Sequence, residues 1–105
     1  MARPVSGATA SDPRLLRLAD GDTVMIVIKP IAAGERFAVD GVTVETPVTL
    51  PLGFKVAAAD LAEGSVAIRY GMPIGRFTRP AARGELVHTH NLESLYMRTH
   101  ARGEA

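Results

Sequence analysis

Two of the three histidines in this chain of 105 residues lie one residue apart, at the end of an apolar run. On a β-strand His88 and His90 would point to the same face, with their Cα atoms about 6.5 to 7 Å apart, because side chains alternate with a period of two. Two imidazoles at that spacing can share one metal ion or one substrate. Four arginines precede the pair, with no acidic residue between Glu63 and Glu85: Arg69, Arg76, Arg79 and Arg83. The cluster predicts a site for an anionic ligand.

His88 and His90 suit proton transfer beside a carboxylate. Histidine titrates near neutral pH, so it can take a proton from a carbon atom or return one to a leaving hydroxyl group. A divalent metal ion bound by both histidines would stabilise the charge that develops on the substrate carboxylate. Such an ion needs at least one more ligand, which Glu85, Asp60 or a partner chain would have to supply. The alternative is a pair of surface histidines at the end of a strand, with Asn91 capping a turn.

Lysine and arginine have two interpretations each. Lys55 either pairs with a substrate carboxylate or is an ordinary solvated lysine of a strand. The four arginines either clamp a carboxylate in bidentate fashion or form a solvated face or a subunit contact. His100 lies near the carboxyl end of the chain, and we assign it no function.

Composition narrows the class of protein. With 12 basic and 11 acidic residues the net charge is +1, which provides no broad field for binding nucleic acid. The chain has no cysteine, so disulfides and thiolate metal sites are excluded. No apolar run approaches the roughly 20 residues of a membrane span, and residues 1–12 lack the apolar core of a signal peptide. We therefore expect a cytoplasmic protein without nucleic-acid or membrane partners.

The pattern of apolar residues predicts a mostly β fold with short helical turns. Residues 23–28 are β-branched and apolar at nearly every position, as in a strand covered on both faces. Asp40-Gly41 separates two strand-like runs, which is the usual spacing of a tight hairpin. We divide the chain into a flexible amino-terminal arm or docking segment (1–22), a β-domain (23–95) and a tail (96–105).

A weak repeat indicates how the strands are connected. Three short segments place an apolar residue three positions before a glycine, at Gly34, Gly64 and Gly84, and a strand resumes after each. Their spacing is too irregular for a solenoid. We therefore expect the same corner three times in a compact, folded-over β structure.

An ordered series of motifs resembles the SAF domain of the altronate/galactarate dehydratase family over roughly residues 20 to 95. The motifs are Val27-Ile28-Lys29-Pro30-Ile31-Ala32-Ala33-Gly34, Pro51-Leu52-Gly53-Phe54-Lys55-Val56-Ala57, Tyr70-Gly71-Met72-Pro73-Ile74-Gly75 and Gly84-Glu85-Leu86-Val87-His88-Thr89-His90-Asn91. The resemblance implies a β-clip, a long hairpin folded over on itself. The small subunit of sulfolactate sulfo-lyase is similar as well.

The resemblance also implies a reaction. In that family the domain is either the amino-terminal part of a long enzyme or a separate small subunit, and the reaction is β-elimination from a hydroxy acid. A larger dehydratase subunit would hold most of the chemistry, together with any divalent metal of the Fe or Mn type. The matching positions make His88, His90 and Lys55 candidate catalytic residues. Arg69, Tyr70 and Asn91 become candidates for binding the substrate.

One position departs from the family. Where the family has Gly-His-Lys, this chain has Gly53-Phe54-Lys55, so a role for that histidine cannot be carried over. Phe54 either packs as an apolar ring or marks a change of substrate or a loss of activity. The second class of function is therefore a SAF module that binds a ligand or partner without chemistry. A homo-oligomer is compatible with either class.

Overall fold

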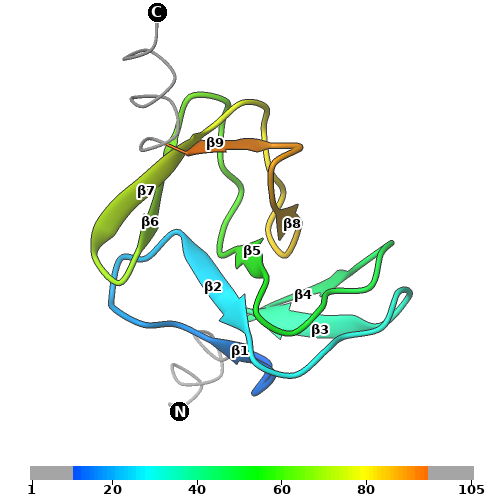
Figure 1. The fold of residues 1–105 in the computed structure, drawn as a ribbon. Coiled ribbons are helices and arrows are strands. Elements are labelled where there is room, and N and C mark those ends of the chain that lie inside the picture. Colours follow the sequence, from blue (N-terminus) through cyan, green and yellow to red (C-terminus); the bar gives the residue numbers. More distant parts are fainter. Residues whose placement is uncertain (1–10, 95–105) are drawn as a thin grey trace, which may run out of the picture.

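This computed structural model describes residues 11–94 of the chain, which contain nine strands (Figure 1). The strands are β1 (Leu15–Leu16), β2 (Val24–Val27), β3 (Arg36–Val39), β4 (Val42–Glu45), β5 (Lys55–Ala57), β6 (Val66–Arg69), β7 (Met72–Phe77), β8 (Leu86–Val87) and β9 (Leu92–Ser94). The mostly β fold is confirmed. The expected short helical turns are β-turns instead, since residues 11–94 contain no helix, and so none that could cross a membrane.

The centre of the molecule is an antiparallel sheet in the order β1-β2-β5-β8. The strand expected at residues 23–28 is β2, and it contributes to both cores as its apolar run predicts. Val24 packs in one hydrophobic cluster, and Met25 and Val27 pack in the other. Burying side chains on both faces makes β2 the strand around which the domain is organised.

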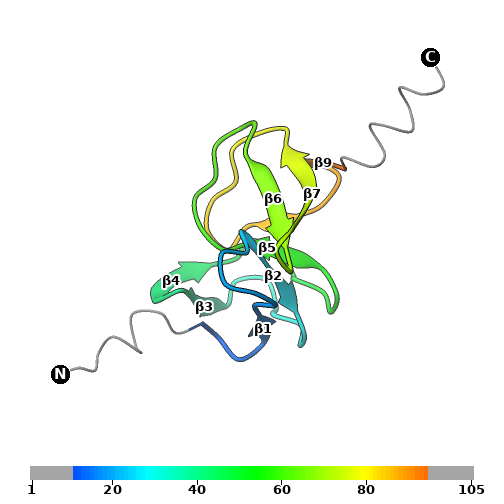
Figure 2. The ribbon, with the colours of Figure 1, turned by 90° about the vertical axis from the view of Figure 1, so that its left-hand side faces the viewer.

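Two hairpins leave this sheet in different directions (Figures 1 and 2). The hairpin of β3 and β4 turns at Asp40-Gly41, as predicted. Its Phe37 and Val39 side chains pack in one of the two cores. The hairpin of β6 and β7 turns at Tyr70-Gly71 and packs through Ala67 and Phe77 into the other core, where β9 adds a third strand. The sheet therefore separates two small cores.

Glycine corners connect the strands, and four of those in residues 11–94 share one pattern of hydrogen bonding. The three predicted corners are present, and Gly53 adds one that the repeat did not reveal. The φ angles of all four glycines lie between 83° and 89°. Each glycine amide donates to a carbonyl elsewhere in the fold: Gly34 to Thr46, Gly53 to Val27, Gly64 to Phe77 and Gly84 to Ala57. The fourth corner was missed because Pro51-Leu52 replaces the small and polar residues of the other three.

The described part of the expected amino-terminal arm, residues 11–22, lies against the domain. β1 pairs with β2, and Leu15 is only 6% exposed in the core beside β3. Arg14 pairs with Asp12 and Glu35, at 2.9 Å each. Residues 1–10 and the expected tail, 96–105, lie outside the described residues.

Candidate functional site

The histidine pair lies in a turn. β8 ends at Val87, and the carbonyl of His88 accepts hydrogen bonds from the amides of Asn91 (3.0 Å) and Leu92 (2.9 Å). The expectation that His88 and His90 share the face of one strand is therefore wrong. The chain has to reverse between the central sheet and β9, and these residues make that reversal. Both histidines are exposed.

Asn91 fixes this turn. Its side chain is fully buried; Oδ1 accepts from the amide of His88, and Nδ2 donates to the carbonyl of Leu86, both at 2.9 Å. Nδ2 also lies 3.4 Å from the carboxylate of Glu85. The turn cap that the sequence left open as an alternative is present. With no exposed surface, Asn91 can affect a substrate only through the histidines that it positions, which argues against the predicted direct contact.

His88 lines a small pocket of about 140 Å³ together with Gly53, Phe54, Lys55 and Val87. Lys55 lies opposite Val87 in the pairing of β5 with β8, which brings Phe54 beside His88. The two rings are in contact, with centroids 5.0 Å apart and planes tilted by 44°. The structure thus joins two predicted catalytic residues at the place where the family histidine is missing.

His90 lines a different pocket, of about 440 Å³, which is mostly apolar. It lies between the end of the β3–β4 hairpin and the corner at Gly84, and its other lining residues are Glu45, Thr46, Pro47, Val48, Ala82, Arg83, Gly84, Glu85 and Leu86. Glu85, which was considered above as a third metal ligand, also lines this pocket. Its carboxylate accepts the amide of Ala82 at 2.9 Å.

These positions do not fit a metal site made by residues 11–94 alone. The two histidines line separate pockets, and residues 11–94 contain no group of three metal-binding side chains of the His, Cys, Asp or Glu type. Asp60, the other ligand considered, accepts the amide of Arg83 at 2.9 Å. A ligand set that includes either histidine would need groups from outside the described residues.

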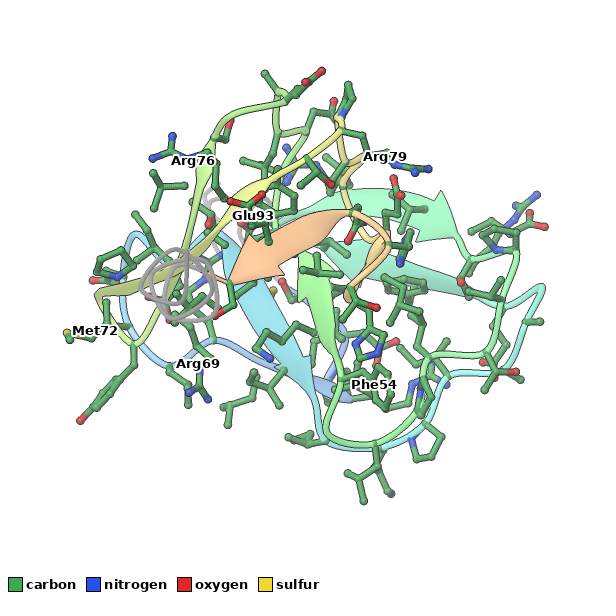
Figure 3. The ribbon with its side chains drawn as sticks, turned by 45° about the horizontal axis from the view of Figure 1, so that its top comes forward. Phe54, Arg69, Met72, Arg76, Arg79 and Glu93 are labelled. Atoms are coloured by element: carbon green, nitrogen blue, oxygen red, sulfur yellow. The ribbon has the colours of Figure 1, made fainter. Side chains whose placement is uncertain are left out.

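The arginines do not converge on the histidines. Arg69 lies in β6, Arg76 lies in β7 and Arg79 follows β7, and Figure 3 shows the three side chains well apart from one another. Arg83 alone lines a histidine pocket, that of His90, and its guanidinium donates to the carbonyl of Ala58 at 2.9 Å. The predicted anion clamp is therefore not assembled within residues 11–94.

A buried carboxylate that the sequence analysis missed organises the β6–β7 turn. Asp22 is 3% exposed and accepts hydrogen bonds from the amides of Tyr70 (2.8 Å), Gly71 (2.9 Å) and Ala19 (3.0 Å). Burial by itself raises the pKa of Asp22, but these three amides and the charge of Arg17 outweigh it and hold the pKa below its usual value. No local signal distinguishes Asp22 from neighbouring Asp20, because two of its three amide partners are 48 and 49 residues away.

Replacing Asp22 by asparagine is expected to destabilise the domain by about 1–3 kcal/mol, since an amide NH2 then faces backbone donors. Because the pKa of Asp22 is lower in the native state, the carboxyl group binds a proton more readily in the unfolded chain. The free energy of unfolding therefore decreases as pH falls below about 4. Urea unfolding at pH 7 and at pH 3 tests both points. The difference between wild type and variant should shrink at pH 3, and a constant difference would contradict the assignment.

Together the fold and the site define an antiparallel β-domain that presents histidines on a fixed turn but lacks a complete catalytic set within residues 11–94. The chain belongs to the altronate/galactarate dehydratase SAF domain family, whose model matches residues 13–95. The resemblance inferred from the motifs is confirmed.

Three relatives are similar to this chain. Altronate dehydratase of Bacillus subtilis is 32% identical over 73 residues, which are 70% of this chain and 15% of that protein. Altronate dehydratase of Escherichia coli is 37% identical over 70 residues, 67% of this chain and 14% of that protein. The (2R)-sulfolactate sulfo-lyase subunit alpha of Chromohalobacter salexigens is 32% identical over 82 residues, 72% of this chain and 87% of that subunit. The chain thus spans about one seventh of the dehydratases but most of the lyase subunit.

Proposed function

We propose that this domain serves as the small subunit of a sugar-acid dehydratase of the altronate/galactarate type, and that a larger chain holds most of the chemistry. The observation that carries the proposal is the match to 87% of a protein named as one subunit of a lyase. Altronate dehydratases instead contain a region of this kind as about one seventh of their length. We place the proposed complex in the cytoplasm.

The geometry supports a subunit that needs a partner. The pocket at His88 is small, with a volume of about 140 Å³, and it is open to solvent. A six-carbon acid would extend beyond it. The walls that exclude water and hold the rest of the substrate would therefore come from the larger chain.

The proposed reaction is β-elimination of water from an anionic hydroxy acid. The ammonium group of Lys55 would hold the substrate carboxylate, which makes the neighbouring carbon more acidic. The imidazole of His88, which lines the same pocket, would take the proton from that carbon or give one to the hydroxyl leaving from the next carbon. His90 would take part where the larger chain joins its pocket to that of His88. The C–H and C–O bonds break, the double bond forms between the two carbons, and the proton and hydroxyl leave as water. Any Fe- or Mn-type ion would belong to the assembled complex.

The test measures turnover by the isolated chain, by the larger chain and by their mixture, against a panel of aldonates, aldarates and sulfolactate. Release of a 2-keto acid, or of sulfite, reports the reaction. We expect turnover by the mixture alone, because residues 11–94 contain neither a closed pocket nor a full set of catalytic groups. Turnover by the isolated, metal-supplemented chain would refute the proposal, as would a larger chain that is equally active by itself.

A second candidate is a SAF module that binds a partner without chemistry. Phe54 in place of the family histidine is the observation that favours it. The same mixing experiment separates the two candidates, since this module would form the complex without changing kcat.

A further inference from the structure

The two hairpins of the domain turn in the same way with different residues. At the β3–β4 turn Asp40 and Gly41 have φ angles of 49° and 82°, and at the β6–β7 turn Tyr70 and Gly71 have φ angles of 56° and 74°. Aspartate adopts positive φ readily, whereas a bulky residue such as tyrosine does so at a cost. The second turn is therefore the strained one.

The side chain of Asp40 is used within the domain. The carboxylate of Asp40 pairs with Arg17. The backbone amide of Asp40 donates to the hydroxyl of Ser11 at 2.9 Å. Tyr70 is the opposite case. Its backbone amide is held from inside by Asp22, but the residue is 70% exposed, the most of any large apolar or aromatic residue in the described part of the chain. The fold thus fixes a strained turn and leaves its ring in solvent.

The residues around this ring are of the kind found in protein interfaces. Met72 is 55% exposed, and Arg69 is exposed beside the turn; Figure 3 shows both projecting outward from the end of the β6–β7 hairpin. Tyrosine, methionine and arginine are enriched at interfaces, and exposed tyrosine and arginine often dominate their energy. Residues 64–84 contain no Asp or Glu, so the β6–β7 hairpin itself carries only basic charged side chains.

This end of the hairpin projects from the domain and lies outside its larger pockets. Arg69, Tyr70 and Met72 line neither of the two histidine pockets, nor the pocket over Asp60 or the one over Lys29. A projecting tip requires a concave surface on another macromolecule, and basic side chains beside it require acidic groups there. Both requirements fit a protein better than a hydroxy acid.

We propose that the Tyr70 tip, defined as Arg69, Tyr70, Gly71 and Met72, docks into an apolar pocket with an acidic rim on the larger chain. This inference depends on the proposed function, which supplies the partner. Binding through this turn costs little backbone conformational freedom, because Asp22 already orders the backbone of the turn. Tyr70 and Arg69 are then interface residues, in place of the substrate-binding residues expected from the sequence.

The decisive variant is Tyr70→Asn, because asparagine is compatible with positive φ and keeps the backbone amide for Asp22. Its affinity for the purified larger chain, measured by titration calorimetry, should fall at least tenfold, the usual effect of losing an interface hot spot. Its Tm should equal or exceed that of wild type. A residue with a merely structural role would lower the Tm and leave the affinity of the folded chain unchanged.

The other hairpin supplies a matched control. Val42 follows Gly41 as Met72 follows Gly71, and it is 46% exposed. Val42→Asn should change the affinity less than about twofold, as expected outside a hot spot, whereas Met72→Asn should weaken it more. Arg69→Glu should weaken binding most at low salt, because screening reduces the contribution of charge. Amides 69–72 should become protected from hydrogen exchange in the complex.

The outcomes separate the inference from the function on which it rests. If wild type binds no larger chain of the family, both fail. If wild type binds and Tyr70→Asn binds equally well, only the inference fails. A wild-type homodimer in light scattering that Tyr70→Asn dissociates would assign the tip to a second copy of this chain, which also overturns the proposal.

Discussion

Replacing His88 by alanine is expected to lower kcat/KM of the assembled pair by about 10²-fold or more, the usual effect of losing a general acid or base. The free energy of unfolding should change by no more than about 1 kcal/mol, because the side chain is exposed in a turn held by Asn91 and only its contact with the Phe54 ring is lost. His90→Ala should behave similarly for the same two reasons. Steady-state kinetics of the pair and urea unfolding of the isolated chain measure the two effects separately.

Thr89→Ala is the matched control, because Thr89 lies between the histidines and is also exposed. It should keep near-normal activity. The double histidine variant adds information, since groups that act as one unit lose little more together than singly. If both single variants retain full activity, the histidines have no part in catalysis and the domain serves assembly; if they unfold the domain, the histidines are structural.

Replacing Gly84 by alanine is expected to destabilise the domain by about 2–5 kcal/mol. A Cβ there would lie 2.6 Å from Val44 Cγ2 and 3.3 Å from Phe37 Cζ, and the φ of +83° is itself unfavourable for alanine. Positive φ costs roughly 1–2 kcal/mol, and overpacking adds roughly 1–3 kcal/mol. Urea unfolding of the variant measures the sum.

Gly34→Ala isolates the two parts of this effect. Gly34 has nearly the same φ, +88°, but no atom within 4 Å of the added carbon, so only the backbone term of about 1–2 kcal/mol remains. Equal losses in the two variants would show that packing at Gly84 contributes nothing. A larger loss at Gly84 would show that its corner is closely packed against the β3–β4 hairpin.

Local sequence determined the parts of the fold whose cause is local. The β-branched run at residues 23–28 predicted β2, and Asp40-Gly41 predicted a hairpin, because period-two burial and positive φ depend on neighbouring residues. The motif series identified the family because each motif is a short run of consecutive residues. The corner at Gly53 was missed only because its residues differ from the repeat.

Tertiary structure alone decided the arrangement of the candidate site. Spacing placed His88 and His90 on one face, but the chain has to turn at that point to bring β9 onto β7, and the turn sends the histidines to separate pockets. Asp22 acquires its role from amides 48 and 49 residues away. Sequence specifies strands and turns through contacts between near neighbours. Which side chains meet depends on how the sheets pack, and that requires contacts between residues far apart in the chain.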